Sequence, residues 1–295
     1  MKKVKVITHN GGFHCDEVFA VATLSLFFEG KIDVVRTRDA GLIDTADMVV
    51  DVGGEYDIPK KRFDHHQTGG AGKRDNGIPY ASFGLIWKEY GGKICGTAET
   101  SNLIDKKIVQ AIDALDNGVE ISTPIYGDVH HYSVFDIVSA FAPSWKEPEG
   151  STDKAFLEAV NFAEKILERE IKKTQDKIEG EKFVKEAYDK AEDKRLIILE
   201  HDYSWGEILS TFKEPLFVVE PVWQNNTWRV KAVRDDRYSF KNRKNFPLEW
   251  AGLRDEELAK VSGVADAVFC HNKLFIAVAK SHEGAIALAK KALLS

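Results

Sequence analysis

The chain has 295 residues, of which 43% are hydrophobic and 30% are charged, and values this close to globular averages exclude disordered, collagen-like and low-complexity proteins. Its length predicts two domains, or one large domain, with enough chain to bury a core. The formal net charge of -6, from 41 basic and 47 acidic residues, argues by itself against a nucleic-acid binder, because the field of the whole chain repels phosphate.

The chain shows no pattern typical of a targeting segment or a membrane span. Its first residues lead straight into a strand-like stretch at Val4–Ile7, and no run of about 18 apolar residues follows. Cys15, Cys95 and Cys270 are far apart and form no CxxC pair, which is typical of free thiols in a reducing compartment. We expect a cytoplasmic protein without a membrane partner, and leave residence in the nucleus or an organelle open.

The first third of the chain alternates strands with helices. Strands that alternate with helices in this way imply a mostly parallel sheet covered on both faces, so the expected fold class is α/β. The strands are expected at Val4–Thr8, Ile32–Arg36 and Met48–Val52, and the helices at Asp16–Phe28, Tyr80–Tyr90 and Ile104–Leu115.

The composition changes at Thr152. Between Thr152 and Asp193 there is no proline, and apolar residues recur at spacings of three and four, which predicts one long helix or two helices broken near Gly180. We therefore expect a catalytic domain over 1–145, a helical connector over 146–193 and a smaller α+β domain over 194–295. In this last domain strands are expected at Leu196–Leu199, Leu216–Val219, Trp228–Val233 and Leu274–Ala279, and helices at Trp205–Phe212 and Ala285–Leu294.

Histidines and carboxylates gather at the ends of the predicted elements of the first domain. Each of them alone is at least as well explained as a surface histidine, a helix cap or a turn residue. Together they would meet at the carboxyl edge of a parallel sheet, where open α/β proteins place their ligands. They are His9, His14, Asp16, Glu17, Asp51, Asp64, His65, His66 and Asp116.

Converging imidazoles and carboxylates indicate a metal centre. Such groups repel one another and lose their hydration unless a cation lies among them. Mixed nitrogen and oxygen ligands suit Mn²⁺, Zn²⁺ or Fe²⁺. The four histidines of this set and three of its carboxylates offer more donor atoms than one ion usually takes from a protein. Two ions about 3.5–4 Å apart, bridged by a carboxylate, would use them, and would polarise a phosphoryl oxygen and generate hydroxide near neutral pH.

At these residues the chain resembles the DHH phosphoesterase superfamily. The superfamily signature is a strand followed by histidine and spaced acids, an aspartate after a second strand, an Asp-His-His triplet and a further aspartate. All four elements occur here in that order, and Asp64-His65-His66 is the triplet itself. More narrowly, the chain resembles the melanocyte-proliferating-gene family of DHH-like exonucleases over almost its whole length. The segments that carry this similarity are 8–17, 51–56, 62–67, 113–118, 250–255 and 268–271.

The resemblance implies two divalent metal ions with Asp51 as the bridging ligand. Mn²⁺ is the expected ion, with Zn²⁺, Fe²⁺ and Mg²⁺ as alternatives, because His14 stands where the superfamily pattern has an aspartate and so removes a negative charge. The implied ligands are His9, His14 and Asp51 for one ion, and Asp16, Asp51, His65 and Asp116 for the other.

The resemblance also implies two catalytic residues beside the metal ligands. Asp64 would orient His65 by accepting a hydrogen bond from its ring, as carboxylates commonly do for metal-bound histidines. His66 would face the substrate phosphate and stabilise the charge that develops on it.

The second domain carries the expected substrate contacts. Between Arg229 and Lys244, seven basic residues stand against two acidic ones, and aromatic residues lie among and beside them. This combination suits single-stranded nucleic acid, although an ordinary pair of solvated strands explains it equally well. It also means that the net negative charge no longer excludes a nucleic-acid substrate. The expected contacts are Arg234, Arg237, Arg243, Arg254 and His271.

We therefore expect a metal-dependent phosphodiesterase in which a hydroxide activated by two metal ions attacks phosphorus. The resemblance makes single-stranded RNA, cut from its 3′ end, the expected substrate. One alternative is a phosphohydrolase that acts on pyrophosphate, short oligonucleotides or cyclic dinucleotides. Another is a non-enzymatic metal- or RNA-binding protein, which the complete set of expected ligands disfavours. The sequence does not indicate an oligomeric state.

Overall fold

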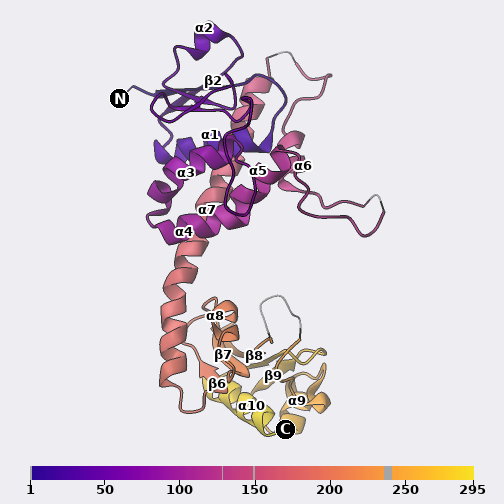
Figure 1. Cartoon of the computed structure of the whole chain (residues 1–295). Coiled ribbons are helices and arrows are strands. Elements are labelled where there is room, and N and C mark those ends of the chain that lie inside the picture. Colours follow the sequence, from indigo (N-terminus) through magenta and orange to yellow (C-terminus); the bar gives the residue numbers. More distant parts are fainter. Residues whose placement is uncertain (1, 128, 149, 236–240) are drawn as a thin grey trace. The chain divides into compact units, whose positions relative to one another are not determined.

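A computed structural model of the chain describes residues 2–127, 129–148, 150–235 and 241–295. The chain divides into two compact units, Met1–Gln175 and Asp176–Ser295, and each described unit contains one five-stranded sheet (Figure 1). The expected mixed α/β class is thereby confirmed. The separate boundaries that we expect for a connector remain a prediction.

Helix α7 (Thr152–Lys190) contributes residues to both units as one continuous helix of 39 residues. Of the two possibilities left open by the sequence, the single long helix is the one observed. Gly180 does not break it. A Cβ atom at Gly180 would lie 3.2 Å from the Tyr203 ring, so the glycine allows close packing against that ring.

The sheet of the first unit has the strand order β2-β1-β3-β5-β4. All adjacent pairs are parallel except β4 with β5, so the expectation of a mostly parallel sheet is confirmed. Because parallel strands run in the same direction, the carboxyl ends of β1, β3 and β5 meet at one edge. The strands are β1 (Val4–Thr8), β2 (Ile32–Arg36), β3 (Met48–Val50), β4 (Tyr56–Asp57) and β5 (Arg62–Phe63).

Helices cover the two faces of this sheet unequally. Val6 points into the main core with α1 (Cys15–Phe27) and α3 (Ser82–Cys95), whereas Ile7 points into a small cluster on the α2 side, because successive strand side chains alternate between faces. Helix α2 lies beyond one face and α1 and α3 beyond the other (Figure 1). The remaining elements of this unit are α2 (Ala40–Ile43), α4 (Ala98–Ile104), a π-helical turn (Asp105–Val109), α5 (Gln110–Asp116) and α6 (Val134–Ala140).

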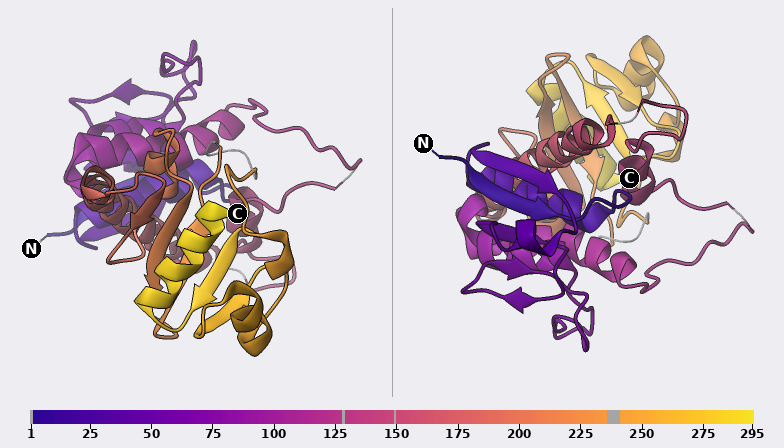
Figure 2. Two further views of the ribbon diagram at one scale, coloured as in Figure 1. Left: turned by 90° about the horizontal axis from the view of Figure 1, so that it is seen from below. Right: turned by 90° about the horizontal axis from the view of Figure 1, so that it is seen from above.

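The second unit has the strand order β6-β7-β8-β10-β9, in which only β6 and β7 are parallel. Helix α10 runs along this sheet (Figure 2) and packs with α9 in the larger core of the unit. The sequence did not predict β9 or α9 in this unit, nor α2, β4, α4 and α6 in the first unit. The elements are β6 (Leu196–Ile198), α8 (Gly206–Ser210), β7 (Phe217–Val222), β8 (Thr227–Ala232), a 3-10 turn (Leu248–Trp250), α9 (Asp255–Ser262), β9 (Ala267–Cys270), β10 (Ile276–Ala279) and α10 (His282–Leu294).

Among the described residues, no helix has an apolar stretch long enough to span a bilayer.

Candidate metal centre

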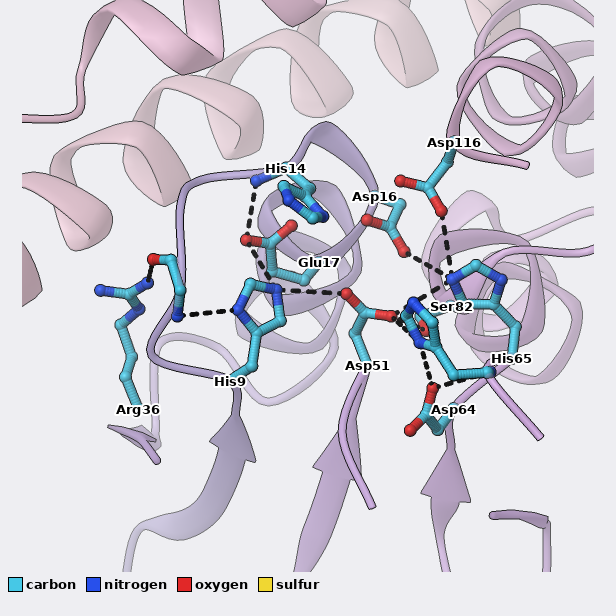
Figure 3. Close-up of polar contacts among 12 residues, drawn as sticks. His9, His14, Asp16, Glu17, Arg36, Asp51, Asp64, His65, Ser82 and Asp116 are labelled. Carbon is cyan, nitrogen blue, oxygen red and sulfur yellow. Dashed lines mark hydrogen bonds and ion pairs between the residues drawn. The ribbon is translucent and has the colours of Figure 1, made fainter. Parts of the chain in front are cut away.

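The carboxyl edge of the first sheet places three of the predicted groups side by side (Figure 3). His9 follows β1, Asp51 follows β3, and the triplet that includes His65 follows β5. His9, Asp51 and His65 are all buried. Asp51 has a φ of +56°, a conformation that is uncommon for a residue with a Cβ atom and that tends to occur at functional sites.

Helix α1 supplies the next group of side chains. Its first turn carries Asp16 and Glu17, both fully buried, and His14 is its N-cap residue. Glu17 accepts a hydrogen bond from the backbone N–H of His14 at 2.9 Å, so the two residues form the reciprocal cap that stabilises helix starts. Asp116 comes from the end of α5. The elements thus bring together residues that lie as far apart in sequence as His9 and Asp116.

Asp51 lies at the centre of the cluster. Its Oδ2 atom is 3.3 Å from Nε2 of His9, and its Oδ1 atom is 3.3 Å from Nε2 of His65. The same His65 nitrogen is 3.1 Å from Asp116 and 3.9 Å from Asp16. The two oxygens of this carboxylate therefore lie near different histidines.

All six residues predicted as metal ligands fall into groups whose donor atoms lie within 4.8 Å of one another. The grouping differs from the expected one. Glu17 joins His9, His14 and Asp51, and His66 joins Asp51 and His65. Asp16 and Asp116 group with His14 and not, as expected, with Asp51 and His65.

The electrostatics of the cluster call for a cation. Burial raises the pKa values of Asp16 and Glu17 well above their ordinary range, and neighbouring carboxylates, including Asp51, add to the effect. Burial also opposes ionisation of Asp51, but the rings of His65 and His9 outweigh it and lower the pKa of Asp51. For His65, burial favours the neutral ring, yet Asp116 and Asp51 raise its pKa to about 10.

Unsatisfied buried atoms gather in the same place. Nε2 of His9, both carboxylate oxygens of Asp16, Oε2 of Glu17 and Oδ2 of Asp51 have no hydrogen-bond partner within the described parts of the chain. Buried polar atoms without partners are rare and need an explanation. Imidazole nitrogens and carboxylate oxygens are the donors that Mn²⁺, Zn²⁺ and Fe²⁺ accept, so these residues fit a divalent metal ion.

The structure corrects the partner that we expected for Asp64. Its Oδ1 atom lies 2.8 Å from Nδ1 of His66 and accepts a hydrogen bond from the His66 backbone N–H at 3.0 Å. Its Oδ2 atom accepts a hydrogen bond from the Gly54 N–H at 2.6 Å. Asp64 therefore orients His66, whereas the ring nitrogen of His65 is directed at Asp51 and Asp116.

Two further residues support the cluster and were not identified from the sequence. The Ser82 hydroxyl, at the start of α3, donates a buried hydrogen bond to Oδ1 of Asp51 at 3.0 Å. Arg36, at the end of β2, donates to the Gly11 carbonyl at 2.7 Å. The signals available in the sequence were a serine near a predicted helix start and an arginine ending a predicted strand, and neither pattern is specific.

The residues of the second unit that we expect to contact substrate have three different environments. Arg254 lies over the Phe269 ring, with its guanidinium carbon 4.6 Å from the ring centroid, and the His271 ring lies 6.1 Å from the same centroid. Arg243 instead donates to the backbone carbonyls of Ser210 and Pro215, which gives it a structural role inside the unit. Arg234 is exposed.

Arg237, the remaining expected contact, lies outside the described residues, as do the aromatic residues Tyr238 and Phe240 of the same basic stretch.

The fold and the cluster together define an α/β protein with a candidate metal centre at a sheet edge. The model of the uncharacterised protein family UPF0160, named MYG1_exonuc, matches residues 5–293. The chain is 34% identical to a MYG1 protein of Caenorhabditis elegans, over 97% of this chain and 94% of that protein. It is 33% identical to the MYG1 exonuclease of Homo sapiens, over 99% of this chain and 86% of that protein. The chain belongs to the MYG1 family, which confirms the expected family membership.

Proposed function

We propose that the protein is a metal-dependent phosphodiesterase of the DHH type, and that it acts as a 3′-to-5′ exonuclease on single-stranded RNA. The observation that carries this proposal is the convergence of His9, Asp51 and His65 at the carboxyl edge of a parallel sheet, among buried carboxylates. Relatives named MYG1 exonuclease support a nuclease. The Asp-His-His triplet directly after β5 supports the DHH type.

The proposed ligands are the six residues expected from the sequence, with Asp51 between two ions. The opposed contacts of Asp51 with His9 and His65 support that bridging role. Mn²⁺ is the proposed ion because the resemblance to the DHH superfamily implies it, and the mixed nitrogen and oxygen donors suit it. When bound, such ions polarise a phosphoryl oxygen and lower the pKa of water.

His66 is proposed to hold and release a proton at the substrate. Its side chain is 58% exposed, whereas Asp64 beside it is 2% exposed. An ionised carboxylate can only accept hydrogen bonds, so the contact with Asp64 requires the proton on Nδ1 of His66 and leaves Nε2 for a substrate oxygen. Asp64 is then a positioning residue that selects the tautomer and orientation of His66.

In the second unit, the proposed substrate contacts centre on Phe269. An aromatic ring beside Arg254 and His271 combines a surface for base stacking with groups that bind phosphate. Arg234 and Arg237 remain proposed contacts on the strength of the sequence alone.

We also propose a cytoplasmic enzyme without a membrane partner. The three cysteines are free and buried, which is typical of proteins in a reducing compartment. Imaging of the tagged full chain in its native cell tests this proposal, and accumulation in a membrane fraction would contradict it.

The proposed activity is tested with a panel of substrates, each assayed with Mn²⁺ and with a chelator. The panel contains single-stranded RNA labelled at either end, single-stranded DNA, dinucleotides and pyrophosphate. With Mn²⁺, RNA labelled at the 5′ end should shorten stepwise, and RNA labelled at the 3′ end should release its label as a mononucleotide at once. The chelator should abolish both reactions.

A pair of variants at the same sheet makes the test specific. Asp51→Asn should lower the rate by more than about 100-fold, the upper loss typical of residues that merely support metal ligands. Asp57→Asn on β4 is the matched control, because its partly exposed carboxylate pairs only with Lys60 among the described residues, and it should keep the wild-type rate. Turnover of pyrophosphate or dinucleotides alone would favour the small-molecule alternative, and equal rates in both variants would remove the enzyme proposal.

A further inference from the structure

Glu17 is a buried acidic residue that is not among the proposed metal ligands. Its side chain is fully buried, and its Oε1 atom accepts a hydrogen bond from the His14 N–H at 2.9 Å and lies 3.4 Å from Nε2 of His9. Its Oε2 atom has no hydrogen-bond partner in the described parts of the chain. A buried carboxylate with one satisfied and one unsatisfied oxygen needs a further partner.

Capping of α1 does not explain this arrangement. A capping box needs one acceptor at the third helical position. The cap of α6 meets that need with Asp136, whose Oδ2 atom accepts from the Ser133 N–H at 2.6 Å at an exposed site. A neutral glutamine would serve equally well at position 17. Capping therefore accounts for Oε1 but leaves the burial of a charged Oε2 atom unexplained.

We propose that Glu17 is a further protein ligand of the metal ion assigned to His9, His14 and Asp51. This inference rests on the proposed metal centre. One donor atom from each of these four residues lies within 4.8 Å of the others, which is close enough for the four residues to share one ion. The ion would then have two imidazoles and two carboxylates around it, a donor set that Mn²⁺, Zn²⁺ and Fe²⁺ all accept.

The charge of the cluster supports the same assignment. Asp16, Glu17 and Asp51 are buried and Asp116 is 11% exposed, so four carboxylates share one poorly hydrated site. Divalent cations among these groups would offset their negative charge, so a charged Glu17 oxygen directed at an ion is less costly than one that is buried without a partner.

Metal binding by Glu17→Gln tests the role directly. Glutamine keeps the shape and the oxygen that caps His14 but removes the charge. Mn²⁺ is titrated into chelator-treated protein by calorimetry, and bound metal is counted after dialysis. The wild type should bind two ions, and E17Q should bind one of them at least about 10-fold more weakly, which lowers the stabilisation by excess Mn²⁺ by about 1.4 kcal/mol. Asp136→Asn, in the cap of α6, is the matched control and should bind as the wild type does.

The outcomes separate this inference from the proposed function. A wild type that binds no Mn²⁺ overturns both. A wild type that binds two ions, with an E17Q variant that binds both equally well, overturns the role of Glu17 and leaves the metal centre standing. If E17Q does not fold without metal, Glu17→Asp replaces it in the same titration. That variant keeps the charge but shortens the reach by one methylene, so one ion should still bind more weakly, and wild-type affinity for both ions would contradict the proposal.

Discussion

Arg36 is expected to hold the loop His9–His14, which carries two of the proposed ligands. Its side chain is 2% exposed and packs against the rings of both Phe13 and Phe156, with the guanidinium carbon 4.9 and 4.5 Å from their centroids. It also donates a hydrogen bond to the carbonyl of Gly11 in the middle of the loop at 2.7 Å. Replacement of Arg36 by methionine keeps an unbranched stem and removes these contacts.

The expected loss of stability follows from the contacts removed. Each cation–π contact contributes about 0.5–2 kcal/mol, and a hydrogen bond from a charged group contributes about 1.5–3 kcal/mol. The ion pair with Asp153 contributes little, because Asp153 is 75% exposed. Burial lowers the pKa of Arg36, so removal of the charge recovers part of its desolvation cost. We expect Arg36→Met to lower the free energy of unfolding of the first unit by about 2–3 kcal/mol.

Native-state amide hydrogen exchange measures this loss, because a chain of two units need not unfold in one transition. The amides of β1 and α1 should exchange faster in R36M, and its affinity for Mn²⁺ should fall about 10–100-fold, as for other changes that disturb ligand support. Arg62→Met is the matched control. Among the described residues, the half-buried Arg62 side chain donates only to the Lys60 carbonyl, in a solvent-exposed hydrogen bond, and its replacement should cost less than about 0.5 kcal/mol.

Equal exchange rates in R36M and the wild type would refute the reasoning. So would equal losses in R36M and R62M, since the effect would then come from the change of residue type and not from the buried contacts.

Three further predictions concern the same unit. Ser82→Ala removes the buried hydrogen bond to Asp51 and should lower the free energy of unfolding of this unit by about 1.5–3 kcal/mol. Urea unfolding followed by a probe in this unit measures the loss, and a value below about 0.5 kcal/mol would contradict the prediction. Gly84→Ala would place a Cβ atom 1.8 Å from the Asp113 carboxylate, so a thermal unfolding scan should show a destabilisation of about 1–3 kcal/mol, and an unchanged midpoint would count against the packing. Burial alone would lower the pKa of His65, but the neighbouring carboxylates raise it to about 10. Protonated His65 therefore stabilises the fold of the chelator-treated protein. This contribution is complete below the ordinary pKa of about 6.5 and is lost as the pH rises to about 10. His65→Gln should lack that fall in the thermal midpoint, and an identical pH profile would exclude the assignment.

Much of the centre follows from one rule about parallel sheets. His9 directly follows β1, Asp51 directly follows β3, and the triplet that contains His65 follows the short strand β5, so their convergence is predictable from the order of residues along the chain. The partner of Asp64 is not predictable in the same way. Two adjacent histidines follow Asp64, and which ring it contacts depends on the turn of the backbone after β5.

For the basic residues of the second unit, the sequence is a poorer guide to function. The composition of the stretch that contains Arg243 is basic and aromatic, which predicts a substrate-binding surface. In the folded unit, Arg243 donates to two backbone carbonyls from a different part of the chain. The composition shows that a basic residue is present, but the groups that it contacts come from segments far away in the sequence.

The sequence by itself determined the α/β class, most of the strands and helices and the family, and it predicted the six proposed ligands, because hydrophobic periodicity and residues at element ends are local signals. Only the tertiary structure decided which oxygen of Asp51 faces which histidine, that Glu17 shares the cluster of His9, and that Ser82 donates a hydrogen bond to Asp51. These contacts join side chains from separate elements, and their distances depend on how those elements pack against one another.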